Sequence, residues 1–254
     1  MGPSSSPGAG SLADHSLDRI RRTWEGLLGC PSGLTGTGLT VVAQPGGRDP
    51  SQEWIRILCL MGATVASVPP SRVAGVRGRL ASLGTGELVD CDLWAGMLRR
   101  GAETLGPAAL AYADANCFRA PAPDQCIERR SPHDDRVVAL VEACGAADAG
   151  ESGIVNSTSP LFTLEESGVA IAASGYTVWS QELAHVGVLV HPGWRGQGLA
   201  RAVAAAAIAH ALNADLVAQW RARLTLTASR QVARSLGFIE LGWQLSLRLS
   251  PADA

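Results

Sequence analysis

The sequence predicts an α/β protein built in two parts. Strand-like and helical segments alternate along the chain, and 46% of the 254 residues are hydrophobic, which is ample for a buried core. A segment rich in proline and charge, residues 119–136, interrupts this alternation and is the best linker candidate. We therefore expect a disordered Ser/Pro/Gly-rich tail over residues 1–13, a small α/β domain over 14–134 and a second domain over 135–254.

The first domain is expected to begin with a helix and to continue into strands. From Ser16, apolar residues recur every three or four positions until Gly29, as they do on one face of a helix. Two apolar runs, residues 39–44 and 53–70, predict a small antiparallel unit. Two further helices are predicted over residues 70–80 and 92–100.

The second domain shows a more regular order of elements. A short helix is expected over residues 135–147, followed by two strand-like runs joined by the turn sequence EESG. The apolar run at 184–190 precedes a glycine-containing loop and an alanine-rich helix, and another run follows at 216–223. Strand, helix and strand in this order predict a parallel crossover. A helix ending at Gly237 and a last alternating strand complete the domain.

Composition argues against several partners. The formal charge is −2 and all 21 basic residues are arginine, so the chain lacks the clustered positive field that nucleic acid requires. The six cysteines form no Cys-x-x-Cys pair and have no histidine at ligand spacing, which predicts buried free thiols and no metal site. The N-terminus does not resemble a secretory signal, and no apolar run has membrane-spanning length. We expect a cytoplasmic monomer or homodimer without a nucleic-acid or membrane partner.

The stretch HVGVLVHPGWRGQGLARAV, residues 185–203, carries the clearest chemistry. Gly196 and Gly198 stand where a strand must turn into a helix, so unpaired backbone N–H groups gather there. Glycine admits positive φ and leaves no Cβ in the path of an anion, and the helix dipole and Arg195 add positive charge. The segment therefore predicts a cradle for a di- or triphosphate-like anion.

Two nucleotide-binding motifs fit this cradle poorly. A P-loop needs a lysine after its glycines, and the chain has none. The dinucleotide motif G-x-G-x-x-G is half matched by GQGLAR, and Asp215 lies at a suitable distance downstream. However, the residues HPGWR separate the strand from the glycines, and Asp215 precedes the next strand run instead of ending it.

A third cradle, the pyrophosphate site of coenzyme A, fits better. RGQGLA at 195–200 matches the Arg/Gln-x-x-Gly-x-Gly/Ala signature of the GNAT superfamily of acyltransferases. VLVHP resembles that family's splayed fourth strand, and Ser229 followed by Gly237 and Phe238 resembles its closing helix. The resemblance covers about residues 135–254. It implies a GNAT acyltransferase fold, with the first domain as a small α/β extension or a degenerate GNAT-like half.

The resemblance also implies acetyl-CoA as the cofactor. Backbone groups of Val188, Leu189 and Val190 would bond its pantetheine arm. The backbone N–H groups that would hold its pyrophosphate belong to Arg195, Gly196, Gln197, Gly198, Leu199 and Ala200, and Arg201 could reach a phosphate. Trp194 either covers the cofactor or packs on the helix, and Trp220 and Trp243 form core or cleft wall.

The implied reaction is N-acetylation of a primary amine by direct attack on the thioester, without a covalent enzyme intermediate. An alkylammonium of pKa ~10 is neutral in about one molecule per thousand at pH 7, so a general base or a relaying water should face the acceptor. The family often has a tyrosine, an asparagine and a glutamate where this chain has Ala233, Leu226 and Ala184. The acid and base candidates are then His185, Glu182 and Tyr176, with Ser229 and Ser235 acting through water.

The acceptor and two rival functions stay open at this point. The slightly acidic balance favours a cationic small-molecule amine, such as an amino sugar or a polyamine. Because the usual acid for the departing thiolate is absent, another acyl-CoA chemistry is one rival, either with a different acyl group or by decarboxylation. A non-catalytic acyl-CoA-binding module is the other.

Overall fold

The computed structural model describes residues 10–44, 54–80, 87, 90, 93, 103–122 and 125–248. The chain forms two compact units, each assembled from separate segments. The larger unit comprises Met1–Ile20, Ala111–Arg221 and Thr227–Ile239, and the smaller unit comprises Arg21–Leu110, Ala222–Leu226 and Glu240–Ala254. This division differs from the expected boundary at residue 134, because helix α1 and strands β4, β9 and β10 each contribute residues to both units.

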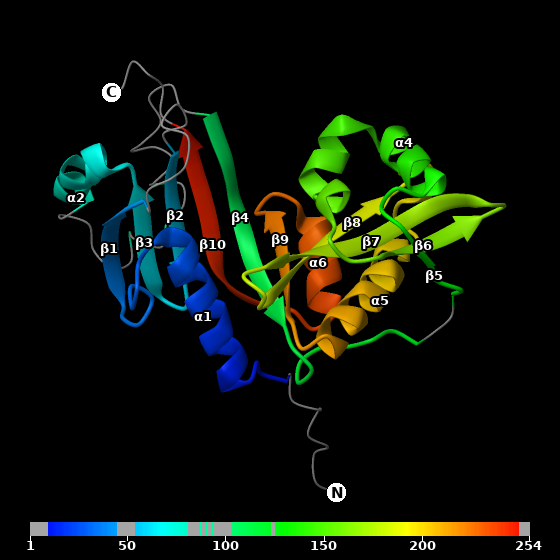
Figure 1. Cartoon of the computed structure of the whole chain (residues 1–254), viewed down its shortest axis with the longest axis horizontal. Helices are drawn as coiled ribbons and strands as arrows, with labels where there is room; N and C mark the ends of the chain where they lie inside the picture. The colour runs from blue at the N-terminus through cyan, green and yellow to red at the C-terminus, as the bar shows by residue number, and fades with distance from the viewer. Residues whose placement is uncertain are drawn as a thin grey trace, which may run out of the picture. The chain divides into compact units, whose positions relative to one another are not determined.

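Strands β9, β8, β7, β6 and β5 lie side by side, in that order, in the larger unit (Figure 1). Three neighbouring pairs are antiparallel, whereas β8 and β9 run parallel, as the sequence predicted for a crossover through a helix. The strands are β5 (Glu128–Arg130), β6 (Leu161–Glu166), β7 (Val169–Trp179), β8 (Leu183–Val190) and β9 (Val217–Arg223).

Two helices cover opposite faces of these strands (Figure 1). On one face, α4 (Asp135–Ser152) and the short helix η3 (Ile154–Asn156) pack Leu140 and Ile154 against Leu189 of β8. On the other face, α5 (Leu199–Asn213) packs Leu199 and Val203 against Val188 and Val190. Neighbouring residues of β8 therefore face different helices, as the alternation of side chains along a strand requires.

The smaller unit has the strand order β1-β3-β2-β10, with β1 (Gly38–Ala43), β2 (Trp54–Leu60), β3 (Ala63–Val68) and β10 (Ile239–Arg248). Strand β2 pairs antiparallel with both β3 and β10, in agreement with the antiparallel unit expected from the apolar runs. Strand β1 lies beside β3 and runs parallel to it, so the unit is not purely antiparallel as expected. Its core joins Ile57, Val68, Leu245 and Trp243 to Val76 of α2 (Val73–Leu80).

The remaining helices and strands agree with the sequence-based expectations only in part. Helices α1 (Asp14–Leu28) and α6 (Thr227–Ser235) form where the sequence predicted them. Helix α4 is kinked at Gly145 and continues to Ser152, past its expected end at residue 147. Strand β4 (Glu103–Ala113) was not predicted, and the expected linker contains β5 and the start of α4. The helix predicted over 92–100 lies almost entirely outside the described residues.

The chain start and the cysteines depart from expectation in part. Residues 1–9 of the expected tail lie outside the described residues, whereas Leu12 is buried and the Ala13 N–H donates to Asp114 at 2.8 Å. Cys30, Cys59 and Cys117 are buried as predicted. Cys126, on the segment before β5, is exposed, and Cys144 of α4 is half-buried and bonds the Val190 carbonyl at 3.5 Å. Cys91 lies outside the described residues. Across the described part of the chain, no helix has the length and apolarity needed to cross a membrane.

Candidate functional site

The glycine segment forms an open row of backbone donors at the start of α5. Gly196 and Gly198 both adopt left-handed φ values, 80° and 79°, and a Cβ built on either would meet nothing within 4 Å. Gly198 is the N-cap of α5, and no side chain caps the helix. The N–H groups of residues 196–200 donate to no acceptor among the described residues. The segment is exposed, so these donors and the helix dipole can meet an anion from solvent.

Two arginines flank the cradle in different ways. The Arg195 guanidinium donates to Asp148 of α4 at 2.6 Å and to the Val190 carbonyl at 3.2 Å, so it fixes the loop to α4 and β8. The Asp148 carboxylate raises the pKa of Arg195 and offsets its positive charge. Arg201, in the first turn of α5, has a buried Nε without a hydrogen-bond partner among the described residues. A buried donor of this kind is costly unless a ligand satisfies it.

The chain before the cradle is held by local contacts. His191 caps the short helix η4 (Pro192–Trp194), because its Nδ1 accepts from the Gly193 N–H at 3.2 Å. Trp194 is half-buried and packs against the α5 cluster. Of the two roles expected for Trp194, the structure shows packing on the helix.

Strands β8 and β9 separate on the approach to the cradle. Their pairing covers Leu183–His185 against Val217–Gln219 and stops there, although β8 continues to Val190 and β9 to Arg223. The unpaired part of β8 is about 16 Å long at 3.3 Å per residue. His191 N–H bonds β7, so alternation turns the backbone groups of Val186, Val188 and Val190 toward β9 and those of Leu189 toward β7. Of these, the Val190 carbonyl already accepts from Arg195.

Polar and aromatic side chains gather where the two strands separate. We call this cluster the apex; it comprises His185, Trp179, Gln219 and Arg221. His185 faces the side of α4 and η3, since Gly187, two residues on, lies against the backbone of Ser152 and Ile154. Its ring stacks on Trp179 with centroids 4.7 Å apart. Gln219 is fully buried and donates to the Tyr112 hydroxyl at 3.0 Å. His185 Nδ1 and Gln219 Oε1 are both buried and neither has a hydrogen-bond partner among the described residues. The apex thus offers one acceptor, Gln219 Oε1, and an imidazole nitrogen that accepts or donates according to its tautomer.

Burial keeps His185 uncharged. It lowers the pKa of His185 from 6.5 to about 3, assisted by the positive charge of Arg221 and opposed by Gln219. At neutral pH this imidazole can accept a hydrogen bond, but it is a weak base toward an alkylammonium.

The low pKa of His185 predicts a specific acid sensitivity. In the unfolded chain the pKa of His185 is 6.5, whereas in the folded protein it is about 3. The unfolded state therefore binds the proton first, and the free energy of unfolding decreases as the pH falls from 6.5 toward 3. We expect His185→Gln to lose less stability than wild type between pH 7.5 and 4.5, as measured by thermal unfolding. The exposed His133 provides the control His133→Gln. Equal acid sensitivity in wild type and His185→Gln would show that His185 titrates normally.

The three catalytic candidates do not meet in one place. Tyr176 faces α5, where its hydroxyl bonds His210 Nδ1 at 2.8 Å, whereas His185 lies on the opposite face of the sheet. Burial raises the pKa of Tyr176. Glu182 lies in the turn before β8 and forms an ion pair with Arg19 of α1. Only His185 belongs to the apex.

The closing helix leaves the position of the expected acid apolar. Ala233 is buried, and Ser229 accepts from Trp220 Nε1 at 3.0 Å, while Trp220 packs edge-on against Phe238. Ser235 is exposed and bonds the Val232 carbonyl. The apex residues Trp179, Gln219 and Arg221 were not candidates from sequence. The available signal was a pair of polar residues two apart in the apolar run VAQWRAR.

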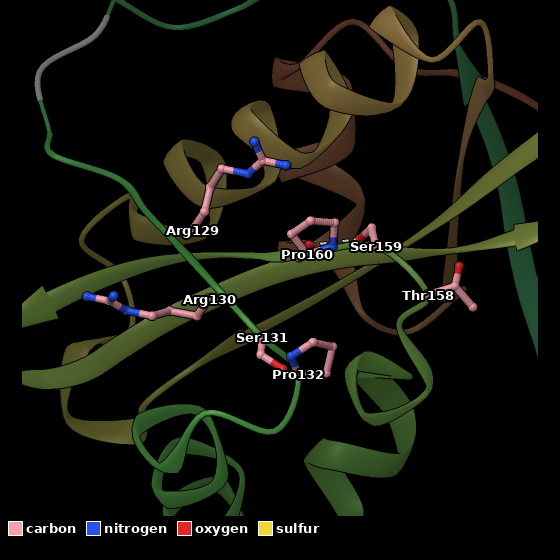
Figure 2. Close-up of a pocket in the computed structure, with 7 residues that line it drawn as sticks. All are labelled: Arg129, Arg130, Ser131, Pro132, Thr158, Ser159 and Pro160. Atoms are coloured by element: carbon pink, nitrogen blue, oxygen red, sulfur yellow. Dashed lines mark hydrogen bonds between the residues drawn. The ribbon is translucent and has the colours of Figure 1, made fainter.

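A separate hollow of about 510 Å³ lies at the other end of the strand order (Figure 2). Arg129 and Arg130 of β5 and the residues before β6 line it, and Figure 2 shows the two arginine side chains pointing in different directions. Arg130 donates to Glu165 at 2.7 Å, and Arg129 lies 3.3 Å from His210. Strands β6 and β7 separate this hollow from β8, so it is not part of the cradle.

Comparison with known proteins agrees with this geometry. Residues 161–242 match the family model for GNAT acetyltransferase. A protein described as an acetyltransferase of the GNAT family from Novosphingobium aromaticivorans has a similar structure, with a TM-score of 0.50 at 19% identity, over 92% of this chain and 98% of that one. A GNAT-family acetyltransferase from Colwellia psychrerythraea gives a TM-score of 0.51 at 15% identity, over 92% and 97%. No curated protein sequence matches significantly.

The chain therefore has a GNAT fold, and residues 161–242 within it match the GNAT acetyltransferase family model. Both structural likenesses extend well beyond this matched segment and into the smaller unit. The residues present fit coenzyme A. The free N–H row of residues 196–200 and the unpartnered Arg201 Nε suit its phosphates, and the separated backbone of β8 suits an extended chain that carries amide groups.

Proposed function

We propose that the protein transfers an acetyl group from acetyl-CoA to the primary amine of a small molecule. The observation that carries this proposal is the separation of β8 from β9 directly before the free N–H row at the start of α5. Together they form one continuous track, with unpaired strand backbone at one end and an anion cradle at the other. Such a track suits a long ligand with an amide-containing arm and a pyrophosphate.

Different residues along the track bind different parts of the cofactor. N–H groups of Gly196, Gln197, Gly198, Leu199 and Ala200 hold the pyrophosphate, with Arg201 as a further donor and Arg195 holding the loop against α4. Backbone groups of Val186 and Val188 bind the arm, and Val190 shares its carbonyl with Arg195. Leu189 contributes by packing against α4. The apex then lies where the arm ends.

The bound thioester supplies the acetyl group: the amine nitrogen bonds the carbonyl carbon, the C–S bond breaks, and the ammonium proton is lost as the thiol forms. At the apex, Gln219 Oε1 can accept from the N–H groups of an amine and orient it, and so can His185 Nδ1 in the tautomer that leaves this nitrogen unprotonated. Since His185 is a weak base, we expect the amine to deprotonate through water and not directly onto the imidazole.

Release of free thiol tests the proposed reaction. The full chain, acetyl-CoA and a panel of primary amines would be incubated together, with thiol followed by a chromogenic reagent and the N-acetyl product by mass spectrometry. Amine-dependent thiol release with matching product supports the proposal. Turnover of an acyl-CoA without amine would replace it by another acyl-CoA chemistry, and tight binding without turnover would indicate an acyl-CoA-binding module.

A further inference from the structure

Arg221 is a cation without an ionic partner at the apex. Its side chain makes no hydrogen bond or ion pair with any described residue; its guanidinium lies over the Trp179 ring, 5.9 Å from the centroid. The Arg221 residue is exposed to solvent, yet the surrounding protein desolvates the guanidinium enough to lower its pKa. The guanidinium is therefore accessible but partly desolvated, and its pairing with an anion is stronger there than in bulk water.

Arg221 lies close to His185 and Gln219, where we propose that the acetyl group is transferred. It follows Gln219 by two residues on β9, so both side chains leave the same face of the strand about 7 Å apart along it. His185 pairs with Gln219 in register, and the charge of Arg221 acts on His185. A molecule with its amine at His185 and Gln219 therefore has Arg221 within a few bonds.

The groups around Arg221 leave its charge available. Glu151, near the end of α4, is the carboxylate that acts most strongly on Arg221, and it raises the pKa of the guanidinium without pairing with it. Tyr112 acts in the same direction, but its hydroxyl bonds Gln219. The Trp179 ring supports the planar guanidinium from one side, which leaves the fork of N–H donors for a carboxylate or phosphate.

We propose that Arg221 binds an anionic group of the acceptor, so that the substrate is a small primary amine that also carries a carboxylate or a phosphate. This rests on the proposed N-acetyltransferase function. It differs from the cationic acceptors suggested by the net charge, because the local charge at the apex is positive whereas the chain as a whole is slightly negative.

Matched amines test this assignment. β-Alanine is paired with propylamine and phosphoethanolamine with ethanolamine, so each pair differs mainly in the anionic group. Wild type should prefer the anionic member of at least one pair, and the preferred pair identifies a carboxylate or a phosphate. Arg221→Gln should raise KM for that member roughly ten- to a hundredfold, as for a lost hydrogen bond to a charged group, with a smaller change in kcat. Arg221→Lys should recover part of the loss.

Two controls separate this inference from the proposed function. Arg129→Gln removes an exposed arginine from β5 and should leave both pairs unchanged. Calorimetry measures the binding of the four amines to wild type and to Arg221→Gln, and it tests the role of Arg221 even if no amine releases thiol. Absence of thiol release would count against the proposed reaction and not against the role of Arg221. Equal use or equal binding of both members of each pair, unaffected by Arg221→Gln, would overturn the assignment.

Discussion

Replacing Gly198 by alanine should remove most acetyl-CoA binding while leaving the fold largely intact. Gly198 caps α5 at φ 79°, and a Cβ at this position meets no protein atom within 4 Å. The stability cost is therefore the backbone strain of a left-handed alanine, roughly 1–2 kcal/mol. The added methyl group would project into the space that an anion needs to reach the N–H row, so affinity should fall at least tenfold.

Gly168 offers a matched control for this substitution. It lies in the turn between β6 and β7 with φ 80°, and a Cβ there also meets nothing within 4 Å. Gly168→Ala should thus lose the same stability as Gly198→Ala and keep wild-type affinity for acetyl-CoA, with both quantities measured by thermal unfolding with and without ligand. If Gly198→Ala binds acetyl-CoA as well as Gly168→Ala does, the cradle assignment is wrong.

The cradle and the crossover could be predicted from the sequence because both depend on local chemistry. Glycines, a following alanine-rich helix and a preceding apolar strand lie within about twenty residues, and local preferences fix their order and their connection. The antiparallel β6–β7 hairpin was predictable for the same reason, since its turn lies between its two strands.

The apex could not be predicted, because it depends on register between segments that are distant in the chain. Whether Tyr176 or Trp179 of β7 joins His185 is decided by which residues pair across β7 and β8, and a shift of one residue would exchange the faces. Gln219 and Arg221 reach His185 only through the parallel pairing of β9. The domain boundary was unpredictable for a related reason: β10 follows α6 in sequence but pairs with β2 of the smaller unit.

The second large effect is expected at Gly237, at the end of α6. Gly237 has φ 89°, and a Cβ built on it would lie 1.9 Å from the Cys117 carbonyl oxygen and 2.9 Å from its carbon. That loop has little freedom to move away, because the Arg119 N–H donates to the Leu236 carbonyl at 2.9 Å and Phe118 N–H to the Asp114 carbonyl at 3.0 Å. Gly237→Ala adds a steric overlap with backbone to the strain of a left-handed residue.

We expect Gly237→Ala to destabilise the protein by roughly 3–5 kcal/mol, well above the strain alone. Gly168→Ala again isolates the strain, since it has a similar φ without the overlap. In thermal unfolding, the Tm of Gly237→Ala should be far below the Tm of Gly168→Ala. Equal stability of the two variants would mean that the Cys117 loop can shift, and the glycine of the Gly-Phe ending would then be required by its φ and not by close packing. The predicted result would instead explain this glycine by the close approach of two backbones, independently of any role in catalysis.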